Sequence, residues 1–328
     1  IGALSFGHLP VIFVPAGPME SGLPNEEKAQ IRKAFARGEI DRAALLKAES
    51  AAYHAAGTCT FYGTANSNQM LMEIMGLHLP GAAFVHPHSD LRHAMTVKAV
   101  HQAVAIHRRS DTPRPLGAML DERSFINAII GLHATGGSTN HTLHLPAMAA
   151  AAGIDLRWDD FADLSDVIPL LARVYPNGKA DVNQFHAAGG IGFVMRTLLE
   201  NGFLVGGAAS VYGKNLEASI VEPILSGHDI VWRDAPDSST NEDILRPADR
   251  SYAPTGGLKV LSGNMGRAVI KISAVDESRH IITAPAIVFD NEADAKQAFV
   301  DGALEKDCII VVQGQGPRAC GMPELHSL

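Results

Sequence analysis

The stretch Gly57-Thr58-Cys59-Thr60-Phe61-Tyr62-Gly63-Thr64-Ala65-Asn66-Ser67-Asn68-Gln69-Met70 presents one cysteine in a loop bracketed by glycines. A free cysteine is most often a small buried side chain, which is one interpretation of Cys59. The hydroxyl residues beside it and the glycines around it favour a functional loop instead. The cysteine alone does not decide between the two.

Helical patterns flank this loop on both sides. Residues 42–54 precede it, with Asp41 predicted to cap the helix and Gly57 to end it. Residues 64–75 follow it, with Thr64 or Asn66 as the predicted cap. Cys59 is therefore expected between two helix ends.

The first part of the chain predicts an α/β domain that spans residues 1–245. The apolar run Leu9–Val14, followed by Pro15-Ala16-Gly17-Pro18, is typical of a buried strand in a parallel sheet. Further helices are predicted at residues 26–37, 91–107, 125–135 and 138–152, and from 159 to 202 with a break at Gly189-Gly190. In the helix after Asp90, the predicted buried face carries Ala94, Val97, Val100 and Val104.

The remaining residues, 246–328, predict a β-rich second domain. Residues 240–255 are rich in turn formers, which indicates a boundary there. Strands are then predicted at residues 258–261, 268–272, 286–289 and 308–312, with one helix at 292–304.

Two further segments are candidates for binding. The turn Gly136-Gly137-Ser138-Thr139-Asn140 opens a helix, where backbone N–H groups and hydroxyls suit a carboxylate or phosphate, although an ordinary helix cap has the same pattern. Glu324 follows Gly321-Met322-Pro323 after a predicted strand, where a carboxylate suits a hard cation or is simply a solvated side chain.

Composition limits the class of protein. The 328 residues are 46% hydrophobic with a net charge of −8 and without blocks of like charge, so no nucleic-acid or membrane partner is expected. Cys59, Cys308 and Cys320 are widely spaced, which favours a reducing compartment, and a cytoplasmic location is predicted.

The sequence resembles a family of iron-sulfur dehydratases that includes dihydroxy-acid dehydratase and 6-phosphogluconate dehydratase. The resemblance rests on four motifs in the family's order. They are the Cys59 stretch, continued through Glu73-Ile74-Met75-Gly76-Leu77-His78-Leu79-Pro80-Gly81, then Gly136-Gly137-Ser138-Thr139-Asn140-His141, Leu261-Ser262-Gly263-Asn264, and Gly316-Pro317 with Gly321-Met322-Pro323-Glu324. The amino-acid sequence of the Cys59 loop is more similar to that of the 6-phosphogluconate dehydratases than to that of the dihydroxy-acid dehydratases.

The resemblance implies a fold, a reaction and cofactors. It implies a barrel-like second domain, and dehydration of 6-phosphogluconate to 2-keto-3-deoxy-6-phosphogluconate, the entry to the Entner-Doudoroff route. It implies an iron-sulfur cluster, of the 4Fe-4S type, with Cys59 as a ligand, and a Mg²⁺ ion at Glu324. Ser138, Thr139 and Asn140 would bind a sugar-acid phosphate, and the assembly would be a homodimer.

The sequence departs from that family at both ends. Two further cluster cysteines, in Cys-Asp-Gly-like and Cys-Asp-Lys segments, belong upstream of Ile1, and the proposed base serine, in Thr-Asp-Gly-Arg-x-Ser-Gly, belongs downstream of Leu328. The 328 residues alone are therefore expected to be a cofactor-free, inactive segment whose α/β domain lacks its beginning and whose second domain lacks its end.

Two alternatives to this function stay open. The substrate could be another 2,3-dihydroxy acid or an unphosphorylated sugar acid; Arg267 and Lys271 are candidate phosphate ligands, but a solvated strand face explains them equally well. The second alternative is a non-catalytic anion-binding or oligomerisation module built on the helix start at Ser138.

Overall fold

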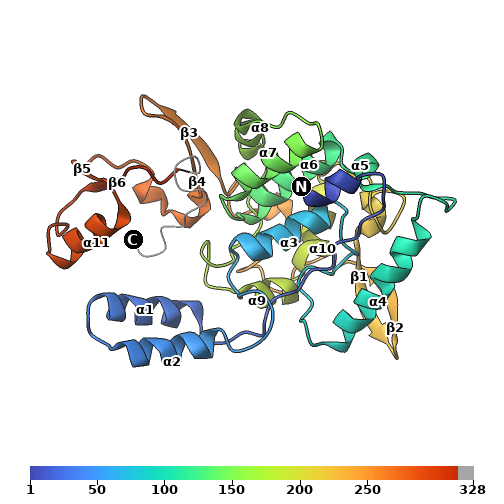
Figure 1. Cartoon of the computed structure of the whole chain (residues 1–328), viewed down its shortest axis with the longest axis horizontal. Coiled ribbons are helices and arrows are strands. Elements are labelled where there is room, and N and C mark those ends of the chain that lie inside the picture. The colour runs from blue at the N-terminus through green and yellow to red at the C-terminus, as the bar shows by residue number, and fades with distance from the viewer. Residues whose placement is uncertain (317–328) are drawn as a thin grey trace. The chain divides into compact units, whose positions relative to one another are not determined.

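The computed structural model describes residues 1–316, which divide into two compact units, residues 1–275 and the segment from Asp276 onward (Figure 1). The helices are α1 Asn25–Ala36, α2 Arg42–Ala52, α3 Thr64–Ile74, α4 Asp90–Ala105, α5 Leu116–Met119, α6 Glu122–Thr135, α7 His141–Ala151, α8 Trp158–Ser165, α9 Val182–Ala187, α10 Gly190–Glu200 and α11 Glu292–Val300. The strands are β1 Val221–Ser226, β2 Asp229–Asp234, β3 Lys259–Gly263, β4 Gly266–Ile270, β5 Ala286–Phe289 and β6 Ile309–Val312. Five 3-10 segments complete the described elements, η1 Gly2–Phe6, η2 Leu216–Ser219, η3 Ala248–Arg250, η4 Ile272–Ala274 and η5 Glu277–Arg279.

The core of the first unit is built around α3, α6 and α10, which contact one another (Figure 1). Met70 and Ile74 of α3 are fully buried and face α6 at Gly131, where an added Cβ would lie 2.6 Å from Ile74 Cδ1. Gly131 therefore allows the two helices to approach closely. α3 is therefore tightly packed, and its first residue follows directly on the loop of Cys59.

The strands pair in three two-stranded sheets among the described residues. β1 pairs with β2 and β3 with β4, both antiparallel, whereas β5 and β6 of the second unit run parallel with α11 between them in sequence. The predicted mixed α/β class is confirmed, and so are the strands β3 to β6 and helix α11. The β1–β2 hairpin was not predicted because its surroundings are rich in turn formers, and the predicted barrel-like form stays a prediction.

The run Leu9–Val14 is not a strand, so this prediction was wrong. The segment is irregular, and its described backbone bonds include Phe13 N to Leu77 O at 3.0 Å. Phe13 and Val14 remain 38% and 47% exposed. An apolar run predicts burial but does not supply the neighbouring strand that a sheet needs.

The buried face of α4 also differs from the prediction. Val97, Val100 and Val104 are exposed, whereas Met95 and Ala99 are buried together with Arg92. The Arg92 guanidinium donates to Ala82 O and Val85 O at 2.5 and 2.9 Å, which turns the opposite side of the helix inward. The cap is Ser89 rather than Asp90.

The helical patterns around Cys59 are confirmed, but two of their predicted ends are not. Asp41 caps α2 through Ala44 N at 2.8 Å, yet α2 ends at Ala52, well before Gly57. α3 begins after Gly63 without a side-chain cap. Residues 166–181, which were expected to be helical, are mostly irregular. They connect α8, which ends at Ser165, to α9, which begins at Val182.

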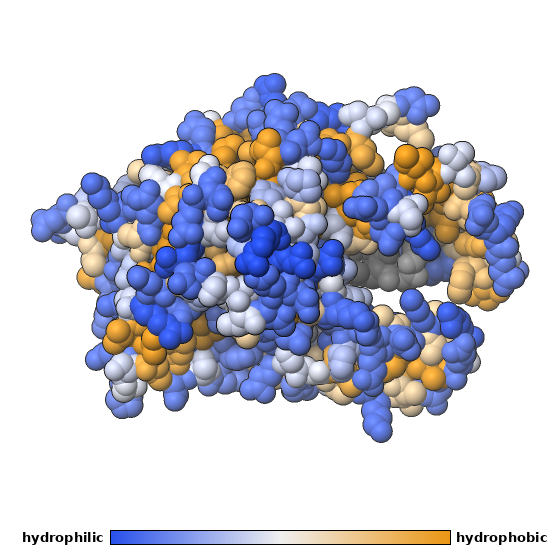
Figure 2. Space-filling model, turned by 180° about the vertical axis from the view of Figure 1, so that it is seen from behind, coloured by the Kyte–Doolittle hydropathy of each residue, from blue (hydrophilic) through white to orange (hydrophobic). Residues whose placement is uncertain are grey.

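Apolar residues reach the surface in several separate patches set among hydrophilic ones, as Figure 2 shows for one face of the molecule. Among residues 1–316, helices that are both long enough and apolar enough to cross a membrane are absent.

Candidate functional site

The loop that carries Cys59 is held in place by Asn66 of α3. The Asn66 amide donates to Cys59 O at 2.5 Å and to Phe61 O at 2.6 Å, and its carbonyl accepts from Thr58 Oγ1 at 2.7 Å. This explains why Asn66 is not a cap, since its side chain serves the loop before the helix. Cys59 is half-buried and free.

The start of α3 also contacts the turn before α7. Thr64 Oγ1 lies 3.0 Å from Ser138 Oγ and accepts from Asn140 Nδ2 at 2.7 Å. Ser138 N donates to Ser67 Oγ at 3.2 Å. The structure therefore brings the Cys59 loop and the predicted binding turn to the same end of one helix.

The turn itself begins α7 three residues later than predicted, at His141. α6 ends at Thr135, as predicted, and Gly136 follows it in the left-handed conformation with φ +61°. Thr139 is half-buried and its carbonyl accepts from Thr142 N at 3.0 Å. Ser138 is 9% exposed, so its hydroxyl is close to the surface of this end of α7 but largely covered.

His141 is a buried polar group at this helix start. Its Nε2 lies 2.8 Å from Ser67 Oγ, while its Nδ1 has no hydrogen-bond partner. Burial, and then the positive charges of His144 and Lys271, lower the pKa of His141 to about 3, so the ring is neutral near pH 7. Hydrogen-bonding capacity is therefore unmet beside Ser138.

Lys28 is a buried cation that lies against Phe61 of the Cys59 loop. It is 5% exposed, its Nζ donates to Asn25 Oδ1 at 3.4 Å, and it lies 4.9 Å from the centre of the Phe61 ring. Burial lowers the pKa of Lys28, and the charges of Asp181 and Cys59 oppose that shift. Sequence patterns could not identify it, because a lysine on an amphipathic helix is normally solvated.

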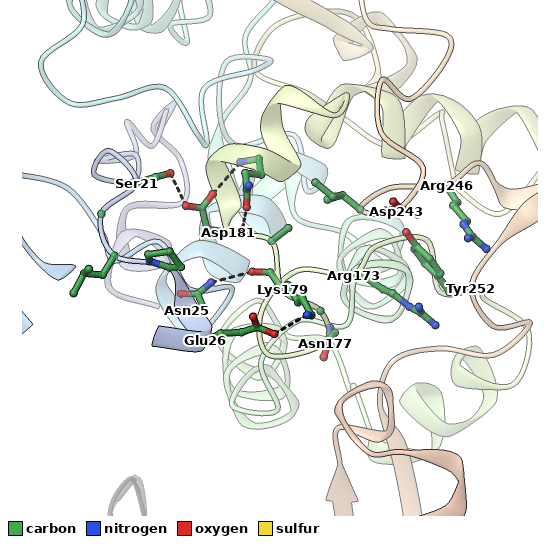
Figure 3. Close-up of a pocket in the computed structure, with 17 residues that line it drawn as sticks. Ser21, Asn25, Glu26, Arg173, Asn177, Lys179, Asp181, Asp243, Arg246 and Tyr252 are labelled. Atoms are coloured by element: carbon green, nitrogen blue, oxygen red, sulfur yellow. Dashed lines mark hydrogen bonds and ion pairs between the residues drawn. The ribbon is translucent and has the colours of Figure 1, made fainter. Parts of the chain in front are cut away.

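A cavity of about 720 Å³ lies beyond the loop, lined by residues 21–26, 173, 177–181, 184, 243–244, 246 and 252 (Figure 3). Its wall is tied to the Cys59 loop, since Tyr62 N donates to Tyr175 O and Val182 N to Thr60 O. The guanidinium carbons of Arg173 and Arg246 each lie 4.3 Å from the Tyr252 ring centre, so that ring is held between two cations.

The described residues do not complete a metal or cluster site. No group of three or more His, Cys, Asp or Glu side chains within residues 1–316 is arranged to hold a metal ion. An iron-sulfur cluster is held by several protein ligands, and the first unit supplies one thiol, Cys59. Cys320 and the predicted magnesium ligand Glu324 lie outside the described residues. The residues present therefore do not by themselves fit the cluster.

Comparison with protein families identifies the class. The family model described as "Dihydroxy-acid/6-phosphogluconate dehydratase N-terminal" matches residues 1–219, and the one described as "Dihydroxy-acid/6-phosphogluconate dehydratase C-terminal" matches residues 243–328. The chain belongs to the dihydroxy-acid/6-phosphogluconate dehydratase family. This family is generally iron-sulfur dependent.

Within this family, the chain is more similar to phosphogluconate dehydratases than to a dihydroxy-acid dehydratase. The chain is 57% identical to a phosphogluconate dehydratase of Rhizobium meliloti and 52% identical to one of Escherichia coli, in each case over 100% of this chain and 54% of the relative. It is 32% identical to a dihydroxy-acid dehydratase of Caldanaerobacter subterraneus, over 97% of this chain and 56% of that protein. The chain thus spans about half the length of the curated relatives it matches.

Proposed function

We propose that the complete protein is a hydro-lyase that dehydrates 6-phosphogluconate to 2-keto-3-deoxy-6-phosphogluconate. The main support is the identity of 57% and 52% to two phosphogluconate dehydratases, against 32% to a dihydroxy-acid dehydratase. The reaction removes a proton from carbon 2 and breaks the carbon 3–oxygen bond; the departing hydroxide takes up a proton to give water. The enol that remains tautomerises to the 2-keto acid.

The site geometry supports this proposal. A sugar-acid phosphate carries anions at both ends and hydroxyls between them, so its site must offer hydrogen-bond donors that are already in position. Ser138, Thr139 and Asn140 stand at a helix start that Thr64 ties to the Cys59 loop. We assign Ser138, Thr139 and Asn140 to substrate binding.

The proposal also covers the cofactors, which the described residues do not complete. Cys59 is assigned as one ligand of a 4Fe-4S cluster and Glu324 as a ligand of Mg²⁺; residues 1–316 contain no group of three or more such side chains arranged to hold a metal ion. The division of the chain into domains at residues 245/246, a homodimer and a cytoplasmic location belong to the same proposal. The 328 residues alone are expected to be colourless and inactive.

Three substrates test the reaction. The complete protein is assayed for 2-keto acid formation from 6-phosphogluconate, gluconate and a branched 2,3-dihydroxy acid. We expect kcat/KM for 6-phosphogluconate to exceed the values for the other two acids by roughly 100-fold or more. A site built to bind the phosphate leaves its buried donors unpaired when a substrate without that group binds. Preference for either other acid selects the alternative substrate, and no turnover with anion binding intact selects the non-catalytic module.

Two cysteine variants test the cluster ligand. Cys59→Ser in the complete protein should lose visible absorbance and turnover together, because a hydroxyl is a poor cluster ligand. Cys308→Ser is the matched control, since Cys308 is also half-buried and free but precedes β6 of the other unit. Full absorbance in Cys59→Ser would remove Cys59 from the proposal.

A further inference from the structure

The β3–β4 hairpin carries three cations, and the structure separates them. Lys259 forms an ion pair with Asp166, and Arg267 Nη2 lies 2.6 Å from Asp159 Oδ1. Both pairs are exposed, so these two cations are accounted for as surface charge. Lys271, which follows β4 directly, forms no ion pair with any described residue.

Lys271 also differs in its surroundings. Arg267 is exposed, whereas Lys271 is half-buried. Burial lowers the pKa of Lys271 to about 8, from an ordinary value of 10.5. A lysine that is withdrawn from water without a carboxylate partner destabilises the folded chain, so its charge calls for another explanation.

Hydrogen bonds hold the segment that follows Lys271 beside the turn that ends α6. Ser273, two residues further on, donates through Oγ to Asn177 Oδ1 at 3.0 Å, and Asn177 Nδ2 donates to Gly136 O at 2.9 Å. Ser273 N bonds to Gly257 O, and Gly257 N bonds to His133 O at 2.9 Å. An added Cβ on Gly257 would lie 2.5 Å from Gly136 Cα, which shows how closely the two segments meet.

This placement brings the ammonium group within electrostatic reach of the start of α7. The charge of Lys271 is one of the causes that lower the pKa of His141, the first residue of α7. His141 is 0% exposed and its Nδ1 lacks a hydrogen-bond partner. The charge of Lys271, which has no ion-pair partner among residues 1–316, thus acts on the helix start that carries the unsatisfied His141 nitrogen and, three residues before it, the Ser138 hydroxyl.

We propose that Lys271 is a substrate-binding residue that holds an oxyanion of the substrate, a carboxylate or a phosphate, at the Ser138–His141 turn. The inference rests on the proposed function for the identity of that substrate. Arg267, four residues earlier in β4 and already paired with Asp159, is not part of the site. A bound oxyanion supplies the opposite charge that the described residues do not give to Lys271.

The test measures binding directly in the complete protein. Titration calorimetry with 6-phosphogluconate, inorganic phosphate and gluconate is carried out on the unchanged protein and on Lys271→Met, Lys271→Arg and Arg267→Met. We expect Lys271→Met to weaken binding of 6-phosphogluconate roughly 10- to 100-fold, the usual range for a lost charge-assisted hydrogen bond. Lys271→Arg should restore part of the affinity, and Arg267→Met should change it less than about 2-fold.

The three ligands distinguish the source of the oxyanion. If only inorganic phosphate and 6-phosphogluconate lose affinity in Lys271→Met, the lysine holds the phosphate; if gluconate and 6-phosphogluconate lose it, the lysine holds the carboxylate. Unchanged binding of all three in a folded Lys271→Met protein overturns the inference. Failure of the proposed function is a separate outcome, because it is an absence of turnover in the unchanged protein.

Discussion

Thr64 Oγ1 lies 3.0 Å from Ser138 Oγ and 2.7 Å from Asn140 Nδ2. One hydroxyl at the start of α3 therefore joins the loop of Cys59 to the turn that precedes α7. It accepts from the Asn140 amide, and its own hydrogen can be donated to Ser138. The relative position of the two candidate segments depends on this side chain and on Ser67, which accepts from Ser138 N.

Thr64→Val tests that connection, because valine keeps the shape and removes the hydroxyl. Two partly buried hydrogen bonds are lost, and we expect the free energy of unfolding to fall by about 1–3 kcal/mol. Denaturant unfolding measures it. Thr96→Val is the control, since Thr96 is exposed and bonds only within α4, to Arg92 O. Equal losses in both variants would contradict a special role for Thr64.

Local sequence signals predicted much of the fold. The cap at Asp41, the end of α6 at Thr135 and the strands β3 and β4 each depend on a few neighbouring residues. Long-range partners decided the features that were missed. Arg92 turned α4 by bonding to carbonyls of residues 82 and 85, and the run at residues 9–14 found no adjoining strand among the described residues.

The candidate site was likewise predicted in part from local sequence signals and in part only from the structure. Its motifs located the loop of Cys59 and the turn at residues 136–140, because the residue types themselves carry the signal. Sequence spacing could not separate Arg267 from Lys271, since both carry a positive charge near one hairpin. Only the ion pair of Arg267 with Asp159, and the burial of Lys271, distinguish them.

Gly136→Ala is expected to destabilise the turn before α7. Gly136 has φ +61°, and an added Cβ would lie 2.2 Å from Asn177 Nδ2 and 2.9 Å from Ser273 Oγ. Gly153→Ala is the matched control, because Gly153 has φ +80° with no atom within 4 Å of the added Cβ. The control should lose about 1–2 kcal/mol for the left-handed conformation, and Gly136→Ala more, because of the added collision. A smaller loss in Gly136→Ala would mean that Asn177 moves away freely.

His133 makes the chain sensitive to acid. Its Nε2 donates to Phe161 O at 2.9 Å, and burial above all lowers the pKa of His133 to about 4. The unfolded chain, with an ordinary pKa near 6.5, binds the proton first. The contribution of His133 is thus present above pH 6.5 and is lost as the pH falls through 4, by about 3 kcal/mol.

His133→Gln tests this dependence through the slope of unfolding free energy against pH. Between pH 6.5 and 4 we expect the slope to fall by up to about one proton relative to the unchanged protein. His228→Gln, at an exposed position in the β1–β2 turn, serves as the control and should leave the slope unaltered. An unaltered slope in His133→Gln would show that the ring is protonated in the folded state as easily as in the unfolded one.

Lys271→Met separates a binding lysine from a structural one by its effect on stability. The folded pKa of about 8 lies below the unfolded value of 10.5, so the unfolded chain binds more protons between these values and stability rises with pH across that window. Below pH 8 the charged lysine costs the fold up to about 3 kcal/mol, and partial solvation reduces this. At pH 7 we expect Lys271→Met to raise the free energy of unfolding by about 1–2 kcal/mol, and the gain should disappear near pH 10.5. Arg267→Met, which breaks an exposed pair with Asp159, should change stability by less than about 1 kcal/mol. A loss of stability in Lys271→Met at pH 7 would mean that the ammonium group already serves the fold, and that it does not need an oxyanion from the substrate to balance its charge.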